Sequence, residues 1–203
     1  MTVDPPTACA GWVLAGGHSS RMGSPKGLLE IDGQPLVSRA YCLLAPLCPT
    51  VTVVGAPERF RHLGLVVIAD ERPDIGPLGG ILTALGSSTA DWNLVVACDL
   101  PYLTADWLQY LIGRAASSAA RIVLPESTAG AEPLCALYHR VAAHAIRASI
   151  DRGVLKVTSA LEGLPIERVT PSEIRAFDPR GVLFQNLNTP EEFERARAEL
   201  ERR

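Results

Sequence analysis

The sequence predicts a single α/β domain with a mostly parallel β-sheet flanked by helices. Three observations lead to this prediction. Short apolar runs rich in β-branched residues alternate with segments of helical periodicity along the whole chain. A length of 203 residues suits one hydrophobic core. No repeat, linker or low-complexity segment divides the chain, so one domain is expected over residues 1–203.

The predicted strands are short runs bounded by turn signals. The first is an apolar run that ends at Ala15, and another begins at Trp92 and ends abruptly at Asp99. Pro101 forces the chain out of the sheet soon afterwards, so Asp99 should project from the end of its strand. The remaining predicted strands cover residues 51–54, 65–68, 121–125 and 133–139.

The predicted helices begin at recognisable signals. Apolar residues recur at helical spacing after Pro35, until Pro46 and Pro49 end the pattern. Thr104 fits as the N-cap of a helix over residues 105–116, and the last helix starts where Thr189 fits as N-cap, with Pro190 behind it and Glu192 at the third position. Two more helices are expected over residues 142–150 and 154–161, whereas the mixed pattern of residues 164–181 predicts no single element.

The loop that follows the first strand is rich in features that bind anions. Gly16, Gly17 and Gly23 allow backbone N–H groups to approach a phosphate, while Arg21 and Lys26 add positive charge. The spacing matches neither a Walker loop nor a dinucleotide fingerprint. Before the two cations are considered, an ordinary strand-to-helix turn explains the glycine pair equally well.

Two carboxylates follow predicted strands. Asp99 stands where a hard oxygen ligand could hold Mg²⁺ against a triphosphate, because Mg²⁺ takes one or two carboxylates and completes its shell with phosphate oxygens and water. A capping role for Asp99 is disfavoured because Thr104 already fits as the cap of the next helix. For Asp70, a place in a ligand site and a turn bonded to nearby backbone N–H groups are equally supported.

Charge and cysteine usage exclude several classes of protein. The formal net charge of −3 gives no broad attraction to nucleic acid. Five cysteines without a Cys-x-x-Cys pair favour neither a disulfide framework nor a zinc site, and Cys98 is expected to be a small buried thiol. No apolar run approaches the ~20 residues of a membrane span, and residues 1–10 lack the features of a secretion signal, so a soluble cytoplasmic protein is expected.

A series of short motifs runs along nearly the whole chain. In order they are Leu14-Ala15-Gly16-Gly17 with Arg21-Met22-Gly23 and Lys26, Ile68-Ala69-Asp70, Gly76-Pro77-Leu78-Gly79-Gly80, Cys98-Asp99-Leu100-Pro101, Glu132-Pro133-Leu134 and Asn186-Leu187-Asn188-Thr189-Pro190. This series resembles the molybdenum cofactor guanylyltransferases, within the wider class of nucleotidyltransferases.

The resemblance implies a Rossmann-like nucleotidyltransferase domain that transfers GMP from GTP to the phosphate of molybdenum-molybdopterin and releases pyrophosphate. It implies transient contacts with other proteins of cofactor biosynthesis or with molybdoenzymes, and it places Asp70 in the GTP site. Our hypothesis is that Leu14, Ala15, Gly16 and Gly17 hold the nucleotide. Arg21 and Lys26 would then neutralise the triphosphate, and Asp99 would hold Mg²⁺.

Several alternatives stay open at this point. Pro25 before Lys26 resembles the related cytidylyltransferases, whereas Gly16-Gly17 favours GTP over CTP. A sugar-phosphate nucleotidyltransferase and a non-catalytic protein that binds or delivers the cofactor are further possibilities. We expect a nucleotide-binding half at about residues 10–105 and an acceptor-binding half at about 106–203, in which the loop 126–132 could meet the second substrate. Asn186 and Asn188 suit substrate binding and local turn bonding equally.

Overall fold

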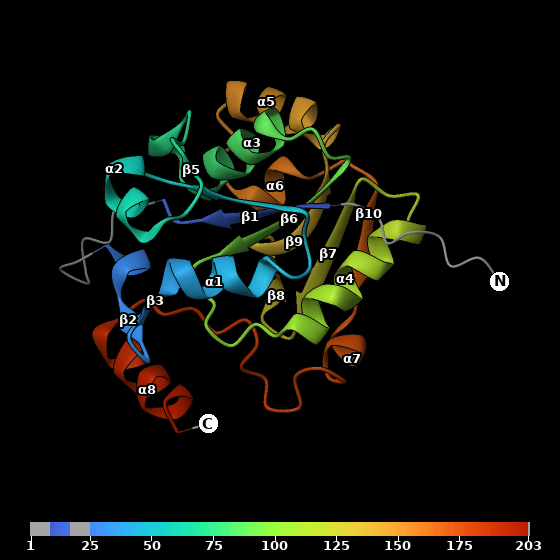
Figure 1. The fold of residues 1–203 in the computed structure, drawn as a ribbon. Helices are drawn as coiled ribbons and strands as arrows, with labels where there is room; N and C mark the ends of the chain where they lie inside the picture. Colours follow the sequence, from blue (N-terminus) through green and yellow to red (C-terminus); the bar gives the residue numbers. More distant parts are fainter. Residues whose placement is uncertain (1–8, 17–24, 203) are drawn as a thin grey trace.

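The computed structural model describes residues 9–16 and 25–202. Its centre is an eight-stranded sheet in the order β10-β7-β9-β6-β1-β4-β5, with β8 paired to β7 (Figure 1). The strands are β1 (Cys9–Leu14), β4 (Thr50–Val54), β5 (Val67–Ile68), β6 (Trp92–Ala97), β7 (Ile122–Ser127), β8 (Gly130–Ala131), β9 (Cys135–His139) and β10 (Ile166–Val169).

The sheet is mostly parallel, as expected. β1 pairs in parallel with β4 and β6, β4 with β5, and β7 with β10. β9 pairs antiparallel with both β6 and β7. The carboxyl ends of β1 and β6 therefore meet at one edge, where ligands of open α/β sheets bind.

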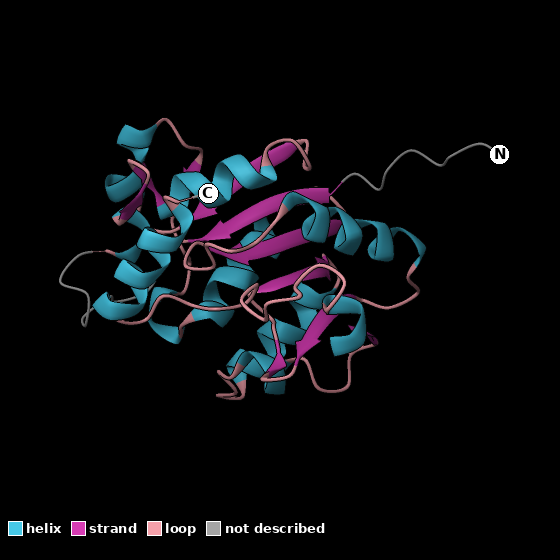
Figure 2. Cartoon of the chain, turned by 90° about the horizontal axis from the view of Figure 1, so that it is seen from below, coloured by secondary structure: helices cyan, strands magenta, loops and turns pink. Residues whose placement is uncertain are grey.

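Helices cover both faces of the sheet, and Figure 2 shows the strands fanned between them. Side chains alternate along β1, where Cys9 and Val13 pack on one face while Trp12 and Leu14 pack on the other. The first face is covered by α1 (Leu36–Leu44) and α4 (Ala105–Ser117), and the second by α3 (Pro77–Ser87), α5 (Ala142–Asp151) and α6 (Val157–Ala160).

A small satellite core brings the C-terminal segment to the start of α1. The hairpin of β2 (Glu30–Ile31) and β3 (Gln34–Pro35) lies beside α8 (Pro190–Leu200) (Figure 1). Ile31, Leu187 and Phe193 are buried together there. The segment just before α8 is thus held close to Leu29, which precedes the hairpin.

The sequence-based predictions of strands and helices are largely confirmed. Thr104 caps α4, and Thr189 caps α8 in a capping box with Glu192. The short helix α2 (Pro57–Phe60) was not predicted. The mixed segment contains β10 and α7 (Pro171–Ile174), and short 3₁₀ turns occupy Lys26–Leu28, Arg61–Leu63 and Pro73–Ile75.

The β2–β3 hairpin is a missed element. Its turn is made by Asp32 and Gly33, which both have positive φ, at 53° and 67°. An Asp-Gly pair is typical of such a two-residue turn. The strands are only two residues long, so they left no alternating pattern in the sequence.

Close packing of α3 gives a first testable prediction. A Cβ at Gly79 would lie 2.3 Å from the carbonyl oxygen of Arg72, whereas a Cβ at Gly86 of the same helix meets nothing within 4 Å. Gly79→Ala should therefore lower the free energy of unfolding by about 1–3 kcal/mol. Gly86→Ala should raise it by up to about 1 kcal/mol, because alanine favours a helix. Urea unfolding of both variants measures the difference, and equal effects would contradict the close contact.

Candidate active site

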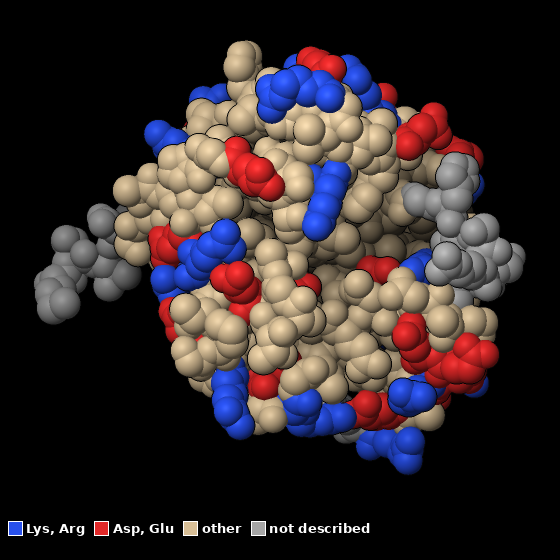
Figure 3. Space-filling view, turned by 180° about the vertical axis from the view of Figure 1, so that it is seen from behind, with Lys and Arg blue, Asp and Glu red and all other residues tan. Residues whose placement is uncertain are grey.

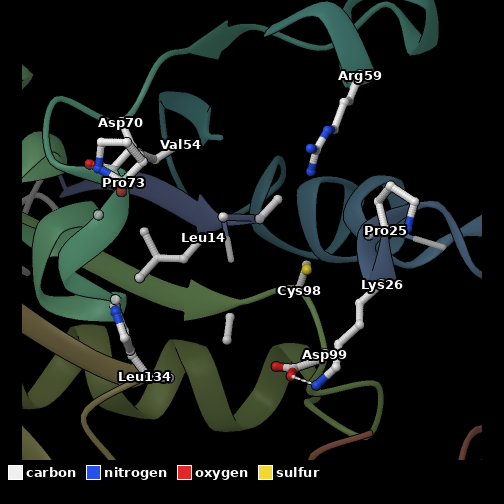
Figure 4. A pocket seen from close by; sticks show the side chains of 17 residues that line it. Leu14, Pro25, Lys26, Val54, Arg59, Asp70, Pro73, Cys98, Asp99 and Leu134 are labelled. Atoms are coloured by element: carbon white, nitrogen blue, oxygen red, sulfur yellow. Dashed lines mark hydrogen bonds and ion pairs between the residues drawn. The ribbon is translucent and has the colours of Figure 1, made fainter. Parts of the chain in front are cut away.

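A cavity of about 230 Å³ opens at the carboxyl ends of β1 and β6 (Figure 4). Segments far apart in the sequence contribute to its wall: the end of β1, the 3₁₀ turn that starts at Lys26, α2, the start of α3 and the end of β6. It is lined by Leu14, Ala15, Gly16, Pro25, Lys26, Gly27, Val54, Arg59, Asp70, Pro73, Gly76, Pro77, Gly80, Ala97, Cys98, Asp99 and Leu134.

The predicted nucleotide loop contributes to this cavity as far as it is described. Leu14, Ala15 and Gly16 line it, and the Ala15 backbone N–H donates to the carbonyl oxygen of Val54 at 2.9 Å. This bond continues the strand pairing one residue beyond β1, so Gly16 leaves the sheet at the cavity. Gly17 and Arg21 lie outside the described residues.

Lys26 lies in the segment that follows β1, and Asp99 lies just after β6. Their side chains face each other. Lys26 Nζ donates to Asp99 Oδ2 at 3.2 Å and to Asn188 Oδ1 at 2.8 Å. The Lys26 side chain is 22% exposed and that of Asp99 is 19% exposed, which reduces screening of the pair by water. The Leu187 backbone N–H also donates to the carbonyl oxygen of Asp99, at 3.2 Å. The segment before α8 therefore lies against the residues that follow β6.

The Asn188 side chain makes a long-range contact. Its side-chain oxygen accepts from Lys26, 162 residues away in the chain, and the expected role in substrate binding stays a prediction. The turn before α8 is held by Glu192, whose carboxylate accepts from the backbone N–H groups of Asn188 and Thr189 at 2.6 and 3.1 Å. Asn186 is exposed and lies outside the cavity wall.

The protein ligands available at Asp99 suit a metal ion whose coordination shell is completed by the substrate. Within residues 9–16 and 25–202, no three His, Cys, Asp or Glu side chains gather at metal-binding distance. Asp99 therefore offers one carboxylate, which fits Mg²⁺ because this ion often takes one or two carboxylates and fills the other positions with phosphate oxygens and water. A metal that requires an all-protein cage does not fit these residues.

Asp70 lies on the opposite side of the cavity from Lys26 (Figure 4). Its Oδ1 accepts from the backbone N–H of Arg72 and from Thr83 Oγ1, both at 2.9 Å. The turn bonding expected as one alternative is thus present. Its Oδ2 faces the glycines of the wall, since it lies 3.9 Å from a Cβ built on Gly16 and 3.7 Å from one built on Gly80. One oxygen fixes the turn while the other remains on the cavity side.

Arg59 is a lining residue that the sequence analysis missed. It projects from α2 into the cavity, between Asp70 and Pro25 (Figure 4). Its guanidinium makes no hydrogen bond or ion pair with another residue in the described part of the chain. The four-residue helix that carries it begins three residues after the end of β4, and no motif marks it in the sequence.

Cys98 is confirmed as a buried thiol. It is 8% exposed, and burial, together with the neighbouring Asp99 carboxylate, raises the pKa of its thiol to about 12. Such a thiol is protonated at neutral pH and is a poor nucleophile. Cys98 therefore forms part of the wall and not of the chemistry.

Charged side chains of both signs are mixed on the face seen from behind. Figure 3 shows a face that is hollowed near its middle, with acidic and basic side chains interspersed around the hollow. No basic surface suited to nucleic acid dominates this face. Among the described helices, none combines the length and apolar character that a membrane span needs.

Comparison with known proteins identifies the family. Residues 11–164 match the MobA-like NTP transferase domain. A molybdenum cofactor guanylyltransferase from Syntrophotalea carbinolica is 35% identical over 91% of this chain and 89% of its own length. The protein of the same name from Vibrio cholerae is 34% identical over 89% of this chain and 88% of its own.

Solved structures agree with these relatives. The molybdopterin-guanine dinucleotide biosynthesis protein A from Archaeoglobus fulgidus has a TM-score of 0.83 and 25% identity, and the match covers 96% of this chain and 100% of that one. A CMP:2-keto-3-deoxy-manno-octonic acid synthetase matches with a TM-score of 0.73 at 15% identity, over 96% of this chain and 99% of that one. The second likeness shows the fold alone.

With the cavity at the carboxyl edge of this fold, the family match and the full-length relatives identify a nucleotidyltransferase enzyme. The chain belongs to the MobA-like NTP transferase family and, within it, to the molybdenum cofactor guanylyltransferases.

Proposed function

We propose that this enzyme transfers GMP from GTP to the phosphate of molybdenum-molybdopterin, with Lys26 and Asp99 as its central residues. The relatives' names supply the two substrates and the product, a guanine dinucleotide form of the cofactor. The observation that supports the site is the ion pair between the partly buried side chains of Lys26 and Asp99, at the carboxyl ends of β1 and β6. That the reaction takes place in the cytoplasm stays a prediction.

The reaction needs charge neutralisation more than covalent chemistry. An oxygen of the acceptor phosphate attacks the α-phosphorus of GTP, a new P–O bond forms, and the bond to the β-phosphate oxygen breaks to release pyrophosphate. A phosphate monoester is largely ionised near neutral pH, so no general base is required. Positioned positive charge and orientation then supply most of the rate.

Each residue of the site has a distinct task in this proposal. Lys26 carries a compact charge on a flexible stem, so its ammonium can meet phosphate oxygens while its backbone stays in the loop. Asn188 positions this ammonium from the C-terminal segment. Asp99 would hold Mg²⁺ together with the triphosphate, and the ion would neutralise charge on the phosphate oxygens. Arg21, with Lys26, is proposed to neutralise the triphosphate.

The opposite side of the cavity suits the nucleoside. Leu14 and Val54 give it an apolar wall, and Gly16 and Gly80 keep it open beside the Asp70 carboxylate. We propose that Asp70 and these residues hold the base and ribose, whereas Lys26 holds the phosphates. The nucleotide-binding half at about residues 10–105 is proposed on this basis.

GTP is the proposed nucleotide, and CTP is the alternative. Pro25, which resembles the cytidylyltransferase pattern, lines the cavity, so the alternative has a structural basis. A comparison of kcat/KM for GTP and CTP with Mg²⁺ and molybdenum-molybdopterin tests the choice. We expect a clear preference for GTP, and a preference for CTP would overturn it.

Arg59 gives a second testable prediction. Its guanidinium can meet a phosphate group of the nucleotide, because it is positively charged, points into the cavity and has no partner within the described residues. Arg59→Gln should weaken GTP binding by about 1 kcal/mol, or roughly fivefold, since the side chain is exposed and screened. Guanosine binding should stay unchanged.

Arg61→Gln is the matched control for this prediction. Arg61 lies two residues further along, is also exposed, and is not part of the cavity wall. Titration calorimetry with GTP and guanosine measures both variants. Equal GTP affinity of Arg59→Gln and Arg61→Gln would show that Arg59 does not contact the phosphates.

A further inference from the structure

Thr83 is a buried polar side chain close to the cavity, although it does not line the cavity itself. It lies in α3 and is 1% exposed, and Asn93 and Ser149 are buried in the same way. A buried hydroxyl needs hydrogen-bond partners, because an unpaired one costs free energy. The partners of Thr83 therefore indicate what this side chain does.

The Thr83 hydroxyl joins α3 to the turn that follows β5. Thr83 Oγ1 donates to Asp70 Oδ1 at 2.9 Å and accepts from the Glu71 backbone N–H at 3.0 Å. A hydroxyl has one proton, so its donor is used by Asp70. The Arg72 backbone N–H also donates to Asp70 Oδ1, at 2.9 Å. Both hydrogen bonds to the Asp70 side chain therefore end on the same oxygen.

These hydrogen bonds leave the second oxygen of Asp70 for the cavity. Oδ2 accepts no hydrogen bond from any other residue in the described part of the chain, and it lies 3.7 Å from a Cβ built on Gly80. The last torsion of an aspartate side chain is broad, so a loosely held carboxylate can present either oxygen in many directions. A carboxylate held at Oδ1 presents Oδ2 in one direction.

The helix that carries Thr83 also shapes the cavity. Gly80 and Thr83 are three residues apart in α3, so they are neighbours on the surface of the helix. Gly80 lines the cavity, and a Cβ at this position would lie 3.2 Å from Leu14 Cδ2. Glycine thus leaves space at the cavity, while threonine, whose branched side chain restricts its first torsion, holds the neighbouring carboxylate. The two residues form one device on one helix face.

The cost of binding depends on how firmly such groups are held. Each side chain that a ligand has to immobilise reduces affinity, so a group that is already oriented binds more tightly. An alternative is that Thr83 only stabilises the turn through the Glu71 backbone N–H. In that case the loss of the hydroxyl would change stability and would not depend on the Asp70 side chain.

We propose that Thr83 is a positioning residue for nucleotide binding, whose hydroxyl fixes the Asp70 carboxylate so that Oδ2 meets the nucleoside as an oriented hydrogen-bond acceptor. Thr83 does not touch the nucleotide. A nucleoside offers N–H and O–H donors to this oxygen, whereas ionised phosphates are acceptors and carry the same sign of charge. The inference rests on the proposed function, because it takes Asp70 to lie at the nucleoside end of the site.

Thr83→Val tests the inference, because it removes the hydroxyl and nearly keeps the shape of the side chain. It should weaken the binding of guanosine and of GTP by the same factor, about fivefold, as expected for one hydrogen bond. Thr83→Ser keeps the hydroxyl and should bind both ligands within twofold of the wild type. Titration calorimetry measures the affinities, and thermal unfolding shows that each variant is folded. Thr83→Ala should show the same loss as Thr83→Val.

Ser149→Ala is the matched control for the loss of a buried hydroxyl. Ser149 Oγ donates to the carbonyl oxygen of Ala160 at 3.3 Å, and Ser149 does not line the cavity. The control should bind guanosine and GTP like the wild type. Equal affinities of Thr83→Val, Thr83→Ala and Ser149→Ala would show that Thr83 has no part in binding and would overturn the inference.

A double-mutant cycle separates positioning from a structural role. Asp70→Ala should weaken guanosine binding, and Thr83→Val added to Asp70→Ala should cause no further loss, because Thr83 acts through the Asp70 carboxylate. A further fivefold loss in the double variant would overturn the inference. These titrations need no acceptor, so they are independent of turnover. If the wild type binds GTP and forms no product with molybdenum-molybdopterin, the proposed function fails while the titrations still decide the role of Thr83.

Discussion

Replacing Asp99 by Asn should lower the rate of guanylyl transfer on the order of 10²-fold or more and leave the fold intact. An amide oxygen carries no charge and is a poor ligand for Mg²⁺, and the paired cation Lys26 loses its carboxylate partner at 3.2 Å. The measurement is kcat as a function of Mg²⁺ concentration. The variant should require more Mg²⁺ and still fail to reach the wild-type rate.

Asp91→Asn is the matched control for Asp99→Asn. Asp91 immediately precedes β6, so it lies at the opposite end of the strand that leads to Asp99. Its ion pair with Arg140 is exposed and should contribute little to stability. Wild-type kinetics in both variants would contradict the assignment of Asp99 as the metal ligand.

Lys26→Ala should weaken GTP binding by about 1.5–3 kcal/mol, which corresponds to roughly ten- to 150-fold. The charge is proposed to meet phosphates, so the loss should be large for GTP and small for guanosine. Because Lys26 also binds Asn188, the variant should in addition loosen the segment before α8. Calorimetric affinities for GTP, GMP and guanosine separate these contributions.

Lys156→Ala serves as the control, because Lys156 is exposed and lies outside the wall of the cavity. It should bind all three ligands like the wild type. An equal loss of affinity for GTP and guanosine in Lys26→Ala would mean that Lys26 supports the shape of the site and does not contact the β- and γ-phosphates.

The order of strands and helices was largely predictable because local signals were strong. Thr189 and Glu192 form the expected capping box, and the apolar runs of β1 and β6 became the buried centre of the sheet. Other elements depend on tertiary packing. β10 is paired to β7, 44 residues away at Ile122 and Ile166, and its own four residues show no clear alternation.

The sequence predicted a residue of the candidate site where that residue directly follows a strand. Asp99 follows β6, and the structure brings it to Lys26 from 73 residues away, as the hypothesis of a shared phosphate site requires. Arg59 was not predictable, since it lies in a four-residue helix with no motif. The contact between Lys26 and Asn188 depends on how α8 packs on the β2–β3 hairpin, and this packing leaves no local signal in the sequence.

The most direct test of the central claim is the identity of the product. The enzyme is incubated with Mg²⁺, GTP and molybdenum-molybdopterin. The mass of the new species is measured by mass spectrometry, and the released pyrophosphate is quantified. We predict that the acceptor gains the mass of one GMP unit, with one pyrophosphate released for each product formed and none released without the acceptor. Binding of both substrates without any pyrophosphate, or transfer from CTP in preference to GTP, would contradict the proposal that this chain is a guanylyltransferase acting through Lys26 and Asp99.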